Sequence, residues 1–332
     1  MSPSPLLVSL LIAARNEEAT ILSCLRAVSR LDYPTDRLEV LIGNDASTDC
    51  TGPVVVDFIA DKPHFRLIDI PESSTPVRGK AHVLAQLASQ GRGEFLFSTD
   101  ADTEVPPGWI TAMLAAFSPQ TGIVTGVTVP RGHTVFHHLQ ALDWLHALTQ
   151  TSALGGLGIP VTAMGNNMAV RRTAYDDVGG YENLPFSVTE DYALFRAVIG
   201  HGYGFKNLLN PDVLAFSKPV DSVSGFLQQR KRWMRGAFGL PVWMVLGLLV
   251  QYLAGPLLLG VGWFLPVLAV TIYCLKLLLQ TLLLTFALSR LRQTHLLPYL
   301  LPFELYQLII GPVALLYYIL PIPVRWKGRQ YG

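Results

Sequence analysis

The amino-acid sequence predicts an α/β domain with a mostly parallel sheet, followed by α-helices apolar enough to cross a membrane. Strand-like and helix-like segments alternate along the first part of the 332 residues, as they do in parallel sheets. Residues 237–275 then include no Asp, Glu, Lys, Arg or His, although 15% of the whole chain is charged. The change in composition near Arg235 predicts two domains, at residues 1–235 and 236–332.

Aliphatic runs predict the strands, and apolar side chains three or four positions apart predict the helices. In chain order the predicted elements are a strand at 8–13, a helix at 18–30, a strand at 38–43, a helix at 54–60, a strand at 65–70, a helix at 80–88, a strand at 94–98 and a helix at 109–117. A further helical pattern follows Glu190.

The second domain is predicted to contain two or three hydrophobic helices. Residues 238–289 are long enough for two spans of roughly 20 residues each. Residues 296–320 offer a third span, but this segment contains Glu304 and three prolines. Basic residues before the first span and after residue 289 predict cytoplasmic ends, whereas the basic residues after 320 conflict with a third crossing. We therefore expect 296–320 to cross against the charge rule or to be re-entrant or interfacial, with Glu304 lining a substrate path.

The first domain is expected on the cytoplasmic side of the cell (inner or plasma) membrane, as part of a multi-pass protein. Residues 1–5 lack the basic start of a signal peptide, and the apolar run 6–14 is too short to span a bilayer. Cys24, Cys50 and Cys274 lie far apart and fit reduced, buried thiols. A net charge of +1 gives no basic field for nucleic acid.

Polar clusters follow three of the predicted strands, at residues 15–17, 44–47 and 99–102. Any one of them could be a turn or a helix cap, because Asn, Asp and Ser are common in both. Ligands of parallel α/β sheets bind at the carboxyl ends of the strands, where these clusters are expected. Three acid-bearing clusters at one edge of a sheet therefore predict a ligand site.

Asp100 and Asp102 are the predicted metal residues. In extended backbone, side chains two positions apart face the same side, and two carboxylates placed so repel unless a cation or proton compensates. Mg²⁺ or Mn²⁺ takes oxygen ligands and typically uses one or two carboxylates together with substrate phosphates. The pair therefore predicts a cation that neutralises a diphosphate leaving group.

Five short motifs occur in a fixed order along the chain. They are SLLIAARNEE at 9–18, IGNDASTD at 42–49, DAD at 100–102, TED at 189–191 and QRKRW at 229–233. Together they resemble the family 2 glycosyltransferases with a GT-A fold, in the membrane branch that contains cellulose, chitin and hyaluronan synthases and ceramide glucosyltransferase. The resemblance covers residues 8–233. It implies transfer of a hexosyl or N-acetylhexosaminyl group from a nucleotide-sugar, expected to be a UDP-sugar.

The resemblance also implies roles for individual residues. The donor-binding residues would be Ala14, Arg15, Glu17, Asp45, Lys80, Asp100, Gln229 and Arg232. The acceptor-binding residues would be Gly165, Asn166, Glu190 and Trp233. Asp102 would be the metal ligand, with Asp100 close to the sugar and diphosphate. The implied cofactor is Mg²⁺ or Mn²⁺, and the implied partners are a nucleotide-sugar donor, a lipid or glycan acceptor and membrane lipids.

Asp191 would be the general base, which implies inversion at the anomeric carbon by a single displacement. Thr189 could cap the following helix and place Glu190 and Asp191 in its first turn. On the structural alternative these acids only complement the helix dipole. Because a helix N-terminus favours a negative charge, we expect Asp191 to stay ionised and to act through its placement more than through high basicity.

Two other segments leave alternatives open. Arg230, Lys231 and Arg235 could be a basic anchor beside the membrane, and residues 163–168 could form either the acceptor site or a tight turn. His133 and His137 lie one helical turn apart, but the apolar residues interleaved with them favour a helix at the membrane surface over a metal site.

The functional prediction is inverting, metal-dependent transfer of a sugar to a lipid-linked or membrane-associated acceptor. A processive polysaccharide synthase is the first alternative, disfavoured by the absence of N-terminal spans and by the short tail. The second is a membrane protein that senses nucleotide-sugars without catalysis. A transporter with a nucleotide-binding appendage is the third, and the small number of predicted spans weighs against it.

Overall fold

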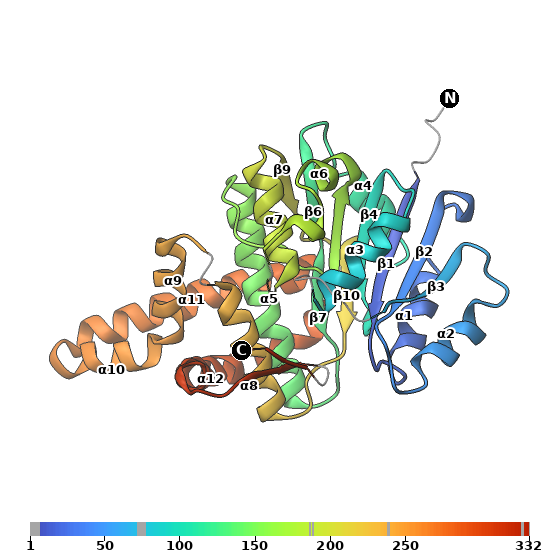
Figure 1. Ribbon diagram of the computed structural model, residues 1–332. Coiled ribbons are helices and arrows are strands. Elements are labelled where there is room, and N and C mark those ends of the chain that lie inside the picture. The colour runs from blue at the N-terminus through green and yellow to red at the C-terminus, as the bar shows by residue number, and fades with distance from the viewer. Residues whose placement is uncertain are drawn as a thin grey trace. The chain divides into compact units, whose positions relative to one another are not determined.

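The computed structural model describes residues 7–71, 78–185, 187, 189–237, 240–326 and 329–331. The predictions made from residues 1–5 and from Lys327 lie outside the described residues. The chain forms two compact units. Figure 1 labels their helices and strands. Unit 1 comprises Met1–Val129 and Thr151–Lys218, and unit 2 comprises Pro130–Gln150 and Pro219–Gly332.

Unit 1 is built on a mixed sheet that has seven strands in the described part of the chain. Their order across the sheet is β3 (Phe65–Asp69), β2 (Leu38–Asn44), β1 (Val8–Ala14), β4 (Phe95–Asp100), β8 (Asn167–Arg171), β6 (Thr121–Thr125) and β9 (Gly204–Asn207). β3, β2, β1 and β4 are parallel neighbours, as are β6 and β9. β8 runs antiparallel to both β4 and β6. Parallel pairs are therefore the majority.

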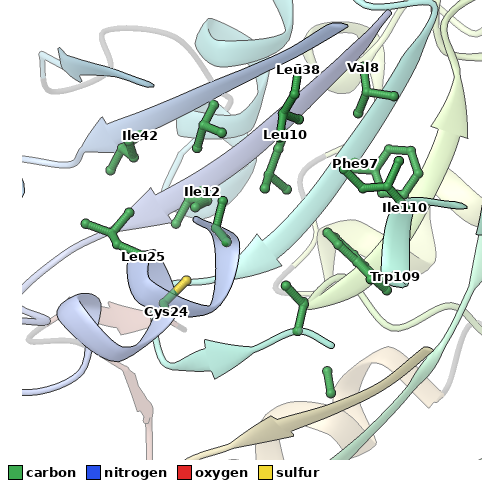
Figure 2. Close-up of a cluster of buried hydrophobic side chains, with 14 of the residues drawn as sticks. Val8, Leu10, Ile12, Cys24, Leu25, Leu38, Ile42, Phe97, Trp109 and Ile110 are labelled. Atoms are coloured by element: carbon green, nitrogen blue, oxygen red, sulfur yellow. The ribbon is translucent and has the colours of Figure 1, made fainter. Parts of the chain in front are cut away.

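Helices cover both faces of this sheet. α1 (Ile21–Val28), α2 (Thr51–Ile59) and α4 (Trp109–Leu114) contribute to one buried apolar cluster, and α3 (Lys80–Gln90), α6 (Arg172–Asp177) and α7 (Glu190–Gly200) contribute to the other. Figure 2 shows side chains of α1 and α4 packed beside β1. Because alternate residues of β1 face opposite clusters, the strand is apolar apart from Ser9, and this apolar run is the signal that predicted it.

The predicted strands of the first half of unit 1 are confirmed, whereas the helices differ at their ends. The helix predicted at 18–30 begins only at Ile21. Asn16 adopts a left-handed conformation with φ 52° and accepts a hydrogen bond from the amide of Thr48 over 2.8 Å. The Glu18 amide donates to the Asp49 carboxylate over 3.1 Å. These contacts hold residues 16–18 in a loop and so exclude them from the helix.

Unit 1 also contains smaller elements that the sequence did not predict. A second sheet has the order β5 (Thr103–Glu104), β10 (Leu214–Ser217) and β7 (Val127–Pro130). Short 3-10 helices lie at η1 (Thr35–Arg37), η2 (Tyr181–Asn183) and η3 (Pro211–Val213). The long helix α5 (Val135–Gly156) contributes its first part to unit 2 and its last residues to unit 1.

Unit 2 is mainly helical. It contains α8 (Val223–Ala237), α9 (Val242–Tyr252), α10 (Ala254–Phe264), α11 (Pro266–Arg290), η4 (Thr294–Tyr299), α12 (Leu300–Ile319) and a hairpin of β11 (Val324–Trp326) and β12 (Arg329–Tyr331). In the described ranges, α11 and the η4–α12 stretch are long and apolar enough to cross a membrane. α9 and α10 are bent by 71° at their junction and would add a third span if the pair counts as one.

Glu304 is buried in unit 2 and lies within α12. Its two carboxylate oxygens accept hydrogen bonds from Nζ of Lys276 over 2.7 and 2.5 Å. The side-chain amide of Gln280 donates to Oε2 over 3.0 Å. Since an unpaired carboxylate is costly in apolar surroundings, these contacts from α11 account for the acid in this helix.

Candidate active site

The loops after β1 and β2 lie side by side because these strands are parallel neighbours, with Ala14 paired to Asn44. The Asp45 amide donates to the carbonyl oxygen of Ala14 over 2.9 Å. The Arg15 guanidinium donates to the carbonyl oxygen of Asp45 over 2.6 Å and lies 3.7 Å from its carboxylate. The structure thus brings together three of the predicted donor-binding residues.

Glu17, a fourth predicted donor residue, lies in the same pair of loops. Its amide donates to the hydroxyl of Thr51 at the start of α2 over 2.7 Å. Its carboxylate accepts from the hydroxyl of Thr20 over 2.7 Å. The position of Glu17 is therefore fixed by both α1 and α2.

The carboxyl end of β4 carries Asp100, and Asp102 lies in the turn that leads to β5. Nζ of Lys80, the first residue of α3, lies 2.5 Å from Oδ1 of Asp100 and 3.2 Å from Oε1 of Glu190. Burial alone would lower the pKa of Lys80, but the neighbouring carboxylates, Asp100 first among them, outweigh burial and raise that pKa. Lys80 is therefore a charged group that joins Asp100, one of the two predicted metal residues, to Glu190.

Hydroxyl groups of β4 hold the segment that precedes β8. Ser98 donates to the carbonyl oxygen of Gly165 over 2.8 Å, and Thr99 donates to that of Asn166 over 3.0 Å. Thr128 donates to Oδ1 of Asn166 over 3.1 Å. Because β8 is antiparallel, its first residues lie at the carboxyl end of β4. Thr99 belongs to the predicted polar cluster at residues 99–102, whereas Ser98 and Thr128 were not predicted.

Asp191 lies in the first turn of α7, as predicted. Its Oδ2 accepts from the amide of Gly165 over 2.8 Å, and its Oδ1 accepts from the amide of Tyr192 over 2.8 Å. Burial, followed by the charge of Glu190, raises the pKa of Asp191 to about 6, although Lys80 and the two amides act in the opposite direction. The sequence predicted that Asp191 stays ionised and acts more through its placement than through high basicity. Burial outweighs the effect of the helix N-terminus, so this carboxylate is more basic than an ordinary aspartate, although a pKa of about 6 still leaves it ionised at neutral pH.

Asp100 and Asp102 supply the oxygen donors that would fit a divalent cation. Within the described ranges, no group of three or more His, Cys, Asp or Glu side chains is placed to hold a metal ion. Mg²⁺, however, usually binds through one or two carboxylates and takes its remaining ligands from substrate phosphates and water. The side chain of Asp100 is 37% exposed, so it is open to a ligand from solution. The two carboxylates therefore fit a cation that arrives with a diphosphate.

Gln229, Arg232 and Trp233 lie on α8 in unit 2. The indole of Trp233 packs edge to face against Trp144, with 5.0 Å between ring centroids. Oε1 of Gln229 is buried without a hydrogen-bond partner among the residues that the structure describes. Unit 2 thus contains three of the predicted site residues, and unit 1 contains all the others.

Gly165→Ala is expected to lower kcat roughly 10²-fold, the cost of a misplacement of about 1 Å at a reacting group. A Cβ at Gly165 would lie 2.9 Å from Cβ and 3.1 Å from Oδ2 of Asp191, so the carboxylate must move. Steady-state kinetics measure the effect. Gly200→Ala is the matched control, since a Cβ there meets nothing within 4 Å at the other end of α7. Equal kcat values for Gly165→Ala and the unmodified protein would contradict this role.

The value of kcat/KM is expected to fall as the pH drops through about 6, because Asp191 must be deprotonated to accept a proton. A pH–rate profile measures this fall, which should be absent from the residual activity of Asp191→Asn.

The stability of the folded protein should decrease as the pH rises through about 6, whereas kcat/KM should increase. The pKa of Asp191 in the folded protein exceeds the ordinary value of 3.8, so between about pH 4 and 6 the folded state keeps a proton that the unfolded chain has lost. This favourable contribution is complete below about pH 4 and is lost as the pH rises through about 6. Asp191→Asn should therefore melt at a higher temperature than the unmodified protein at pH 8.

An activity that is constant from pH 5 to 8 would contradict the assignment of Asp191 as the general base.

Comparison with known proteins shows one family over nearly the whole chain. The sequence profile described as Glycosyl transferase family 21 matches residues 11–332. The beta-monoglucosyldiacylglycerol synthase of Synechocystis sp. is 30% identical over 239 residues, which are 70% of this chain and 48% of that protein. The poly-beta-1,6-N-acetyl-D-glucosamine synthase of Staphylococcus epidermidis is 27% identical over 236 residues, 69% of this chain and 54% of that protein. The chain spans about half the length of these relatives.

A solved structure shares the fold. The mannosyltransferase of Pyrobaculum calidifontis, in complex with GDP-Man and Mn²⁺, superposes with a TM-score of 0.58 and 21% sequence identity. The match covers 91% of this chain and 87% of that one. The predicted resemblance to GT-A glycosyltransferases is confirmed.

Proposed function

The chain belongs to Glycosyl transferase family 21, and on that premise we propose that it transfers a sugar, with inversion, from a nucleotide-sugar to a lipid hydroxyl. It is a glycosyltransferase. The observation that carries the finer proposal is the position of Asp191. This half-buried carboxylate is held by the amide of Gly165, which β4 fixes in turn through Ser98. The same strand ends in Asp100, so one strand anchors both the proposed base and the proposed donor site.

The donor would bind at the carboxyl ends of β1, β2 and β4. Asp45, with Arg15 and Glu17 beside it, would contact the nucleoside, and Lys80 would contact the diphosphate. Asp100 and Asp102 would hold Mg²⁺ or Mn²⁺, which when bound offsets the negative charge that develops on the leaving diphosphate. The structure of the mannosyltransferase with GDP-Man and Mn²⁺ supports a metal-bound nucleotide-sugar in this fold. Gln229 and Arg232 remain predicted donor residues on the strength of their motif, since an Arg side chain can pair with a diphosphate.

The chemical step would be a single displacement. The acceptor oxygen forms a bond to the anomeric carbon, and the bond from that carbon to the diphosphate oxygen breaks with its electron pair. The acceptor proton moves to the carboxylate of Asp191. Since the pKa of this group is raised to about 6, it is deprotonated at neutral pH and still basic enough to accept the proton. Asn166 and Glu190 would line the acceptor side, and Trp233 remains a predicted acceptor residue on the strength of its motif.

A lipid acceptor is supported by two observations. The Synechocystis relative is named for a glucosyldiacylglycerol product. In the described residues of unit 2, two helices are long and apolar enough to span a membrane, or three with the bent pair. A multi-pass anchor in the cell membrane, with unit 1 on the cytoplasmic side, would place a lipid hydroxyl within reach of soluble nucleotide-sugars.

Polymer synthesis is the second candidate, favoured by the similarity to the poly-beta-1,6-N-acetyl-D-glucosamine synthase. On this alternative the acceptor is the end of a growing glycan. Product size separates the two candidates, because single transfer adds one sugar and a synthase gives a ladder of lengths.

The test uses the purified full-length protein in detergent micelles that contain diacylglycerol, with Mn²⁺ and a panel of UDP-sugars and GDP-mannose. We expect one donor to release its nucleoside diphosphate and to give a lipid heavier by one sugar in mass spectrometry. A ladder of products would instead establish the synthase. Release from no donor, or equal release by Asp191→Asn, would overturn the proposed function.

A further inference from the structure

Arg230 is a buried member of the basic run at residues 229–233, with only 9% of its surface exposed. Its guanidinium forms an ion pair with the carboxylate of Asp143 on α5, within unit 2. The hydroxyl of Tyr306 lies 3.4 Å from the same carboxylate. An anchor for lipid headgroups would point its charge into solvent, so the basic-anchor alternative does not describe Arg230.

The guanidinium of Arg230 also lies between two aromatic rings of its own helix. Its Cζ is 4.7 Å from the ring centroid of Phe226 and 4.6 Å from that of Trp233. Residues four before and three after Arg230 share its face of α8, which explains how one cation contacts both rings. Cation–π attraction is strongest over Trp and increases when water is excluded. The face of the Trp233 indole is therefore held by Arg230.

A second contact of this indole comes from α5. Trp144, next to Asp143 in the chain, packs edge to face against Trp233. One turn earlier, the side chain of Gln140 donates to the carbonyl oxygen of Val220 over 2.9 Å and accepts from its amide over 3.1 Å. Together, the contacts of Gln140, Asp143 and Trp144 fix the register of α5 against the segment that contains α8.

We propose that the Asp143–Arg230 pair is a positioning device that sets the orientation of the Trp233 indole, on which the acceptor hydroxyl is presented. This inference rests on the proposed function of Trp233 in acceptor binding. The carboxylate of Asp143 fixes the position of the Arg230 guanidinium, and this guanidinium fixes the orientation of the Trp233 indole. The planar form of Arg is needed, because it can stack on a ring while its edge donates to a carboxylate, whereas Lys is a point charge on a flexible stem.

The first experiment observes the ring directly. Full-length protein is labelled with 5-fluorotryptophan, and the ¹⁹F signal of Trp233 is identified by its loss in Trp233→Phe. Arg230→Lys and Asp143→Asn should each shift or broaden this signal, whereas Arg26→Lys, an exposed site on α1, should not. An unchanged Trp233 signal in both pair variants would overturn the proposal, whatever the substrate of the enzyme.

The second experiment separates positioning from stability. In Asp143→Leu/Arg230→Met both charges are replaced together by apolar side chains, which often leaves a buried site as stable as before. We expect this variant and Arg230→Lys to keep the affinity for the nucleoside diphosphate while kcat/KM for the acceptor falls roughly 10- to 100-fold. Equal kcat/KM values for the acceptor, or a parallel loss of nucleotide binding and melting temperature, would overturn the proposal. A failure of the proposed function would differ, since the unmodified protein would then transfer no sugar.

Discussion

Asp191→Asn is expected to lower kcat for sugar transfer by roughly 10²–10⁴-fold, the usual contribution of a general base, while the protein stays folded. The asparagine side chain has nearly the same size, and its carbonyl oxygen can still accept from the amide of Gly165. It cannot take a proton from the acceptor hydroxyl. Single-turnover transfer with both substrates saturating measures the chemical step without the contribution of product release.

The matched control for this change is Asp57→Asn, an exposed carboxylate on α2. It should keep the kcat of the unmodified protein. Asp191→Asn should also bind the nucleoside diphosphate as tightly as the unmodified protein, because the defect lies on the acceptor side. Retention of full kcat by Asp191→Asn would exclude it as the base.

Asp102→Ala is expected to lower kcat/KM for the donor by roughly 10²–10³-fold, the cost of losing one electrostatic contact to a developing charge. The variant retains only Asp100 of the proposed pair of oxygen donors, and Lys80 already lies 2.5 Å from that carboxylate. The concentration of Mn²⁺ that gives half-maximal release of nucleoside diphosphate should increase together with the loss of rate. A titration with Mn²⁺ at fixed donor concentration measures both quantities.

Asp36→Ala is the control for nonspecific binding of the cation, since its side chain is 81% exposed and remote in sequence from the proposed metal residues. It should not change the dependence on Mn²⁺. If Asp102→Ala shows the same dependence as the unmodified protein, the metal site is elsewhere.

The strands at the centre of the sheet could be predicted because both of their faces are buried. In β1, Leu10 and Ile12 belong to one core cluster and Leu11 to the other, so the sequence is a continuous apolar run. β8 was not predicted, because Asn167 and Arg171 bound a short segment whose strand conformation depends on pairing with β4 and β6. The antiparallel direction of β8 is a long-range property that local periodicity does not encode.

The residues of the candidate site could be predicted where a motif contains them. The effect of neighbouring residues on their pKa values and orientation could not. The sequence identified Asp191 and Gly165, and the structure joins them by a hydrogen bond. The raised pKa of Asp191 depends on burial in the folded protein, which no motif reveals. Arg230 was open to interpretation as a surface anchor, because its partner Asp143 is 87 positions away in the chain.

The anomeric configuration of the first product tests the central claim most directly. The enzyme is supplied with an α-linked nucleotide-sugar, and the linkage of the transferred sugar is read by proton NMR before any later reaction. A single displacement assisted by Asp191 predicts a β-linked product from the unmodified protein and the same β-linked product, formed far more slowly, from Asp191→Asn. An α-linked product would contradict the account, because retention requires two displacements or attack from the same face as the leaving group.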